Sequence, residues 1–369
     1  MSGSGTDLAA DLKAFARAHV APHADRLIRQ TDYPADIWQA LGQAGHLGYG
    51  LGRHGGLDVS PVEMFDLAEA FADGGEVPGM TMLWMGHHAI AGKIIQAYAS
   101  ASQADIWLPR LARGELSAAI AISEPGAGAQ PKAMSATASR RDDGQWVLNG
   151  SKAWLTNGPA AGLFVFVAIT EVVDGRKRFG AFLVPDGVEG LSREPGFEID
   201  YAHPCGHCTL VLKDVVVPDD AWMEEAGDAL ETVLKRFRRV EDLVGLATAA
   251  GGMAAELRRL TAILPDSAAT DLGRLAGERE LVRSAGRQLM ADCNGDPAAP
   301  EHEARLLALR AVSRQFQAGV AELIASADRT DDFLNLLSRD LSQLGRIAQR
   351  IDQAKMARTG ANMLRRSVS

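Results

Sequence analysis

Residues 119–159 read AIAISEPGAGAQPKAMSATASRRDDGQWVLNGSKAWLTNGP. This stretch contains an apolar strand, a Glu-Pro-Gly-Ala-Gly turn, two alternating strands joined by Asp143-Gly144, and a Trp-Leu-Thr-Asn-Gly turn. Alternation of apolar and polar residues around an Asp-Gly dipeptide is typical of a short antiparallel hairpin. The stretch therefore predicts a region of short strands and tight turns.

The strand-rich pattern continues to residue 225, with turn signals every eight to twelve residues. We expect a small β-barrel over residues 119–225, because short strands at this spacing favour barrels and sandwiches. Residues 1–118 and 226–369 have helical periodicity instead. The sequence thus predicts an α+β chain with an N-terminal helical domain, a central small β-barrel domain and a C-terminal four-helix bundle. The clearest elements are strands Leu163–Thr170, Arg176–Pro185 and Thr209–Val217 and helices Asp7–Gln30, Ala35–Ala44, Val62–Ala72, Met82–Ser100, Gln103–Gly114, Ala229–Leu264, Asp271–Cys293, Glu301–Ser326 and Asp331–Ser369.

The composition limits the classes of function. The formal net charge is −9, which disfavours nucleic acid as a partner because phosphate binding needs a basic surface. An acidic average still permits an anionic ligand that meets a local basic rim. The sequence contains no run of 18 or more apolar residues, so it predicts no membrane span. The first residues lack the pattern of a secretory signal. We expect a cytoplasmic protein.

Cys205-Gly206-His207-Cys208, with His203 just upstream, contains enough nitrogen and sulfur ligands for zinc. Four ligands within six residues would strain a tetrahedral site, and the sequence offers no second ligand cluster. We therefore interpret the segment as a turn before the next strand and expect no metal. Three cysteines in a chain of 369 residues favour a reducing compartment.

The turns of residues 119–159 resemble the central β-domain of the acyl-CoA dehydrogenase superfamily, whose pattern runs "TEPxAGSD … LNGxKxWITN". The helical segments YPADIWQALGQAGHLGYGLGRHGG and QADIWLPRLARGE are similar to strings of the same family. The resemblance implies FAD as cofactor. Carried over, it places Ile122, Ser123, Trp154 and Thr156 against the flavin, with Trp154 covering one face and Thr156 bonding its rim. The alternative is that both residues have only structural roles, Trp154 as a barrel residue and Thr156 as a turn residue.

Four segments depart from the family pattern. The family's "GSD" is Gly128-Ala129-Gln130 here, so a hydroxyl that contacts the pyrophosphate is missing. Residues 269–273, ATDLG, stand where the family has an arginine that reaches the FAD of a neighbouring subunit. No glycine-rich segment occurs near Ser326-Ala327-Asp328, and Ala348 or Gln349 stands where the family often has its catalytic glutamate. We expect weaker FAD binding than in ordinary family members.

Residues 241–251, EDLVGLATAAG, resemble the string "ERLVLAAGPLG" of members that carry the catalytic base on an earlier helix. Glu241 is therefore our candidate base, and burial between apolar helices would raise its pKa toward neutrality. The alternative is a solvated helical face of ion pairs formed by Arg238, Arg239, Glu241 and Asp242.

The resemblance implies a flavin oxidoreductase that dehydrogenates an acyl-CoA or acyl-carrier thioester and passes electrons to an electron-transfer flavoprotein. Two alternatives stay open. One is a non-catalytic or partner-dependent subunit of a heteromeric enzyme, which would explain all four departures at once. The other is a flavin oxidase or monooxygenase on the same scaffold. We expect a homo- or hetero-oligomer, because long C-terminal helices need their apolar stripes covered.

Overall fold

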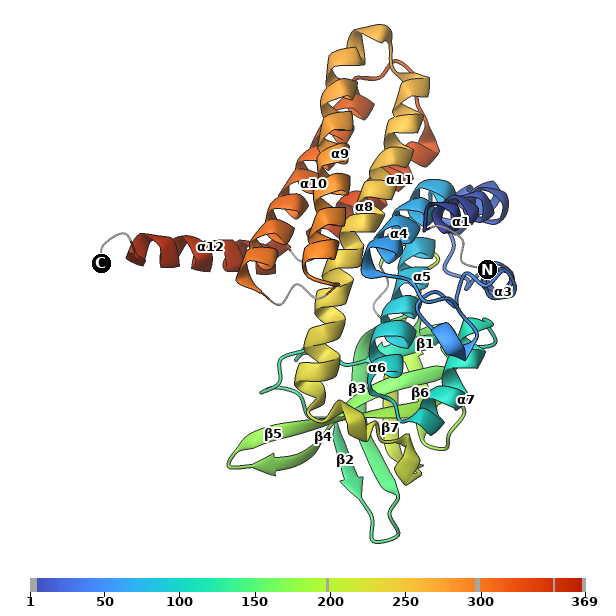
Figure 1. Cartoon of the computed structure of the whole chain (residues 1–369), viewed down its shortest axis with the longest axis vertical. Coiled ribbons are helices and arrows are strands. Elements are labelled where there is room, and N and C mark those ends of the chain that lie inside the picture. The colour runs from blue at the N-terminus through green and yellow to red at the C-terminus, as the bar shows by residue number, and fades with distance from the viewer. Residues whose placement is uncertain (1–4, 197–198, 296–298, 348, 367–369) are drawn as a thin grey trace. The chain divides into compact units, whose positions relative to one another are not determined.

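The computed structural model describes residues 5–196, 199–295, 299–347 and 349–366 (Figure 1). The chain forms two compact units. One combines Met1–Ile28, Pro61–Thr81 and Asp242–Ser369, and the other combines Arg29–Ser60 and Met82–Glu241. The three-domain division after residues 118 and 225 stays a prediction.

The predicted N-terminal helices are present, with one break that proline explains. Pro22 lies in the short 3₁₀ turn Ala21–His23 and divides the helix predicted over Asp7–Gln30, because proline has no N–H to continue the ladder. At the start of α7, Ser100 and Gln103 form a reciprocal capping box. The helices are α1 Gly5–His19, α2 Ala24–Leu27, α3 Ala35–Gln43, α4 Pro61–Gly75, α5 Pro78–Ile90, α6 Gln96–Tyr98 and α7 Ala101–Ala112.

The predicted small barrel is a single curled sheet, a half-barrel with strand order β1-β4-β2-β3-β7-β6 and β5 added beside β4. The Asp143-Gly144 turn joins β2 to β3 as predicted, with Arg140 paired antiparallel to Trp146. The strands β1 and β2 pair with β4 in parallel, and the other pairs are antiparallel. The strands are β1 Ala118–Ala121, β2 Thr137–Arg140, β3 Trp146–Thr156, β4 Leu163–Val173, β5 Arg176–Pro185, β6 Leu191–Pro195 and β7 His207–Val217.

Strand β4 separates two hydrophobic cores within the second unit. Its alternate residues Phe164 and Phe166 pack with the other inward residues of the sheet. Leu163, Val165 and Val167 point to the opposite face and pack with residues of the helices of that unit. Successive strand residues face opposite sides, so a strand buried on both faces reads as a continuous apolar run. The sheet is thus packed on both of its faces along β4.

The C-terminal region consists of helices, but its last segment differs from the prediction. The single helix predicted over Asp331–Ser369 is wrong, because α11 ends at Arg346 and α12 begins at Gln349. Gly345 lies in the last turn of α11, where its low helix propensity weakens continuation. The helices are α8 Arg236–Ile263, α9 Ala269–Asp292, α10 Pro300–Ser326, α11 Asp332–Arg346 and α12 Gln349–Arg366. No helix within the described ranges has the length and apolar character that a bilayer span requires.

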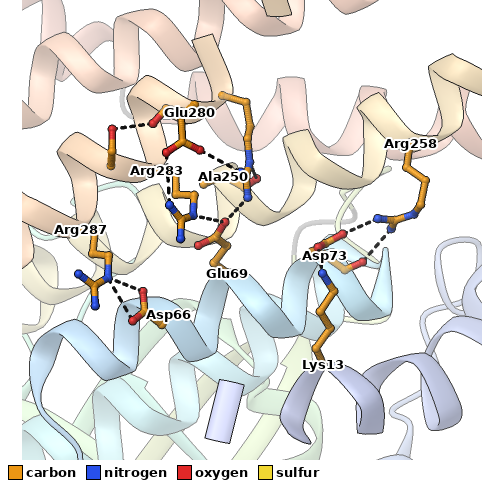
Figure 2. A network of polar contacts seen from close by, with 11 residues as sticks. Lys13, Asp66, Glu69, Asp73, Ala250, Arg258, Glu280, Arg283 and Arg287 are labelled. Carbon is orange, nitrogen blue, oxygen red and sulfur yellow. Dashed lines mark hydrogen bonds and ion pairs between the residues drawn. The ribbon is translucent and has the colours of Figure 1, made fainter. Parts of the chain in front are cut away.

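Ion pairs join α1, α4, α8 and α9 in the first unit, as Figure 2 shows. Asp73 of α4 binds both Lys13 of α1 and Arg258 of α8. Glu69, one turn earlier on α4, binds Arg279 and Arg283 of α9. All of these side chains except Arg258 line a groove of about 600 Å³. Its lining has four bases and three acids, which pair with one another, so the groove has little excess charge to select a ligand.

Candidate functional site

Two turns of the second unit are bonded directly to each other. The segment after β1 carries Ile122 and Ser123, and the end of β3 carries Lys152 and Ala153. The Ala153 N–H donates to the Ser123 carbonyl at 2.8 Å. The Lys152 ammonium donates to the Ile122 carbonyl at 3.0 Å. These two bonds fix the position of the Ser123 turn against β3.

A buried ion pair lies beneath the two turns. Lys152 Nζ lies 2.9 Å from Glu124 Oε1, and the two residues are 0% and 4% exposed. The other Glu124 oxygen accepts the backbone N–H and the hydroxyl of Ser135 at 2.7 and 2.8 Å. Ala136 N–H adds a fourth bond at 3.0 Å. The Glu124 carboxylate therefore has four donors, one of which is a cation.

The pKa values of this pair reflect burial and mutual attraction. Burial alone would raise the pKa of Glu124, but the bonds from Lys152, Ala136 and Ser135 hold it below its usual value. Burial lowers the pKa of Lys152 to about 8, against the opposing effect of Glu124. A charge with this many fixed donors is a structural clamp, and we name residues Glu124 and Lys152 the buried clamp.

The indole of Trp154 is presented by an irregularity in β3. The pairing of β3 with β7 shifts between Lys152 and Leu155, so Trp154 lies in a bulge. Its φ is +63°, a left-handed conformation that is rare for a bulky residue. Bulges re-aim side chains and are common beside active sites. The Trp154 residue is 48% exposed although it carries the largest apolar side chain of the turn.

Thr156 lies two residues further along β3. Its hydroxyl lies 3.2 Å from Nε2 of His207, its register partner on β7. Burial lowers the pKa of His207, so the ring is held in its neutral form. The structure thus places Ile122 and Ser123 directly against β3, the strand whose last residues include Trp154 and Thr156.

The Glu124–Gly128 turn is open at its two glycines. Gly126 and Gly128 have φ of +72° and +58°, and a Cβ added at either would meet no atom within 4 Å. Ala129, where the family has a serine, packs partly buried against the apolar core instead. The Trp154 indole fits a flat ring that would stack on it, because the fold leaves about half of this residue uncovered.

Glu241 differs from the expectation based on burial. Its side chain is exposed, so the prediction that surrounding apolar helices bury it is wrong. The helical period explains the difference, because Val240, Leu243 and Val244 occupy the buried face and Glu241 lies outside it. The next residue, Asp242, binds Arg310 of α10 at 2.5 Å. The structure does not bury the candidate base, and its role stays a prediction.

The other sequence candidates lie elsewhere. Residues 269–273 form the start of α9, and Gln349 is the first residue of α12; Ala348 lies outside the described residues. Burial raises the pKa of Cys205 to about 12 and of Cys208 to about 11, and such thiols are poor metal ligands. Among the described residues, no group of three or more histidine, cysteine and acidic side chains is arranged to hold a metal.

Sequence reasoning missed the partner of Glu124. The Glu-Pro-Gly motif gives no sign of this partner, because Lys152 lies 28 residues later in the sequence. A lysine inside an otherwise alternating strand was the available signal, because a charged residue among buried positions needs a partner.

Comparisons with known proteins agree with this geometry. Residues 5–115 match the model of the acyl-CoA dehydrogenase N-terminal domain, and residues 119–215 match that of the acyl-CoA dehydrogenase middle domain. Together these models span more than half of the chain. The chain belongs to the acyl-CoA dehydrogenase superfamily.

Relatives and solved structures agree with this assignment. Mitochondrial isovaleryl-CoA dehydrogenase of Arabidopsis thaliana is 28% identical over 274 residues, which is 73% of this chain and 65% of that protein. Acyl-CoA dehydrogenase FadE12 of Mycobacterium tuberculosis (strain ATCC 25618 / H37Rv) is 31% identical over 60% of this chain and 56% of its own. The chain thus matches less than two thirds of these relatives' length. Butyryl-CoA dehydrogenase from Megasphaera elsdenii has the same fold, with a TM-score of 0.84 at 19% identity over 99% of this chain and 100% of that one.

Proposed function

We propose that this superfamily member is an FAD-dependent oxidoreductase that removes hydrogen from Cα and Cβ of an acyl thioester. One observation carries the proposal: the Ser123 turn is bonded to β3 directly beside the Trp154 bulge, whose indole is exposed. The names of the relatives support it. A glutaryl-CoA dehydrogenase from Mycobacterium smegmatis, similar in fold with a TM-score of 0.83 at 18% identity, was solved in complex with FADH2.

The chain's residues would divide the work between holding the ring and donating hydrogen bonds. FAD, when bound, supplies the acceptor for the hydride that leaves Cβ. The Ile122 and Ser123 segment supplies donors beside the ring edge where negative charge develops. Trp154 covers one face of the ring, and Thr156 contributes its hydroxyl at the rim. The buried clamp keeps the two turns in register.

Glu241 is the residue that we propose as the base that takes the α-proton. It belongs to the same compact unit as the flavin turns. Because its side chain is exposed, a bound substrate or a partner chain would have to cover it before it takes the proton.

That exposure also favours a second candidate function, a subunit that depends on a partner chain. The segment 269–273 offers no cation for a neighbouring FAD, and Ala129 offers no hydroxyl for the pyrophosphate. We propose acyl-CoA or an acyl-carrier thioester as the substrate and an electron-transfer flavoprotein as the acceptor. Assembly with itself or with another chain and a cytoplasmic location complete the proposal.

The flavin site is tested by Trp154→Ala. Loss of the indole should weaken FAD binding by about tenfold, because aromatic stacking is worth about 1 kcal/mol beyond the area it buries. The measurement is a titration of purified protein with FAD, followed by flavin absorbance between about 350 and 500 nm.

Val172→Ala is the matched control, because Val172 is also exposed and lies on β4 of the same sheet. Trp154→Phe should retain most of the affinity. Equal affinity of Trp154→Ala and the wild type would remove Trp154 from the site, and no FAD binding by the wild type at all would point to the partner-dependent subunit.

The base is tested by Glu241→Gln. The variant should bind FAD normally and lose acyl-CoA-driven bleaching of the flavin, because an amide cannot accept the α-proton. Stopped-flow absorbance with a panel of short acyl-CoA thioesters measures this. Glu231→Gln, in the helical turn just before α8, is the control. Unchanged reduction kinetics in Glu241→Gln would assign the proton to another group.

A further inference from the structure

Two cationic side chains meet where α6 and the start of α8 come together in the second unit. Lys93 lies in the π-helical turn Ala91–Ile95, which continues α5 into α6. Arg236 begins α8 directly after a second π-helical segment, Leu230–Lys235. The Arg236 guanidinium donates to the hydroxyl of Tyr98 at 3.1 Å across 138 residues of sequence. It also lies 5.5 Å from the centre of the Tyr98 ring.

The two cations lack the compensation that the chain gives to its other half-buried bases. Arg258 and Arg310 each bind two carboxylates. Within the described residues, neither Lys93 nor Arg236 forms an ion pair. Burial lowers the pKa of Lys93, and the nearby charge of Arg236 lowers it further. Like charges brought together away from water cost free energy unless an opposite charge joins them.

Arg236 also lacks one of its hydrogen bonds. Arg236 Nε is buried and has no partner among the described residues. An unmade bond to a buried donor costs about 1–3 kcal/mol. Gln96, three residues after Lys93, likewise has a buried Oε1 with no partner among the described residues. A guanidinium that uses one terminal nitrogen for tyrosine still has its other terminal nitrogen to donate to a ligand.

The backbone around the pair is also unusual. Lys93 lies within the π-helical turn Ala91–Ile95, and Arg236 directly follows the π-helical segment Leu230–Lys235. A π turn inserts one residue into the helical ladder and thereby changes the direction of side chains, which is why such turns are frequent at functional sites. Lys93 and Arg236 both remain partly exposed, so a ligand can approach each of them, although Arg236 Nε itself is buried.

We propose that Lys93 and Arg236 form an oxyanion-binding site that receives a phosphate or carboxylate group of a ligand. The terminal nitrogen of Arg236 that Tyr98 does not use binds one oxygen of the group, and the Lys93 ammonium binds another. Tyr98 holds the guanidinium plane in position through its hydroxyl and its ring. This site does not depend on the flavin turns, and it stands whether or not the chain proves to be a dehydrogenase.

The test is the thermal stabilisation of the full chain by inorganic phosphate and, in a separate arm, by glutarate. Each is compared with chloride at equal ionic strength. The wild type should show saturable stabilisation in at least one arm, because a ligand that binds only the folded state raises its stability. Arg236→Gln should weaken that binding tenfold or more. Phosphate alone points to a phosphate-bearing ligand, and glutarate alone points to a carboxylate-bearing one.

Arg238→Gln is the matched control, since Arg238 is exposed on the same helix two residues away. It should bind the anion as the wild type does. If Arg236→Gln does not fold, Lys93→Gln provides the same comparison from the other helix. The proposal is overturned if neither anion stabilises the wild type more than chloride does, or if the Arg236 and Arg238 variants lose binding equally.

Discussion

Two buried glutamates of this chain have opposite acid–base behaviour. Glu124, in the β-rich unit, has four donors including the Lys152 ammonium, and its pKa lies below the usual value. Glu256 of α8, in the unit that holds the C-terminal helices, is fully buried and accepts from Gln317 at 2.8 Å, while its other oxygen, Oε1, has no hydrogen-bond partner among the described residues. Burial raises the pKa of Glu256 to about 8. Depth alone therefore does not set the protonation state; the number and charge of the donors do.

Lys152→Met should have the largest effect on the difference between the two glutamates. It removes the ammonium that binds Glu124 and leaves a buried carboxylate with the neutral donors of Ser135 and Ala136. We expect the free energy of unfolding to fall by about 3–5 kcal/mol, as when one partner of a buried ion pair is removed. Chemical denaturation followed by tryptophan fluorescence measures the loss.

The double variant Lys152→Met with Glu124→Gln is the control, because it removes the stranded charge as well. It should recover part of the stability, and its Glu124 position should then resemble the neutral environment of Glu256. A single Lys152→Met variant as stable as the wild type would show that the clamp contributes nothing to the fold.

Glu256→Gln tests the other side of the comparison through pH. An acid whose pKa is raised in the folded state is most favourable at pH values below its unfolded pKa, near 4.5. Its contribution is lost as the pH rises toward about 8, because the unfolded chain ionises first. Between pH 6 and pH 7 the free energy of unfolding of the wild type should fall by up to about 1.4 kcal/mol relative to that of the variant, which has no titrating group at position 256.

Denaturation curves of both proteins at several pH values give this difference directly. Glu303→Gln, at a half-exposed acid of α10 that binds Lys355, is a suitable control. A stability difference that does not change with pH would mean that Glu256 titrates normally despite its burial.

Ser135→Ala sharpens the comparison with the smallest change. It deletes one hydroxyl bond to Glu124 and leaves Lys152, Ala136 and the Ser135 backbone in place. We expect a loss of about 1 kcal/mol in the free energy of unfolding. Ser139→Ala, on an exposed position of β2, should change stability by less. A Ser135 effect as large as that of Lys152→Met would contradict the view that the cation dominates.

The sequence predicted what depends on short-range pattern. The hairpin at Asp143-Gly144, the strand Arg176–Pro185 and most helices follow from periodicity and turn residues, which act within a few positions. The family motif also pointed to Ile122, Ser123, Trp154 and Thr156. The first two lie against the strand that carries the other two, and the contacts of all four with FAD stay a prediction.

What escaped prediction depends on distant partners. The contacts of Glu124 with Lys152 and of Arg236 with Tyr98 join residues 28 and 138 positions apart. The exposure of Glu241 depends on which helical face meets the rest of its unit, and a motif match fixes the residue type but not that face. The bulge at Trp154 arises from a register shift against β7, which the β3 sequence alone does not specify.

The position of the buried clamp has a consequence for behaviour in salt. Dissolved ions screen charges that face water over about 8–10 Å at ordinary ionic strength, but they do not enter the protein interior. The partly exposed ion pair between Arg287 and Asp66, which Figure 2 shows, will weaken as sodium chloride is added. The Lys152–Glu124 contact, which lies out of water, keeps its strength. The edge that holds the indole is therefore built to tolerate changes in ionic medium that soften the helical face of the other unit.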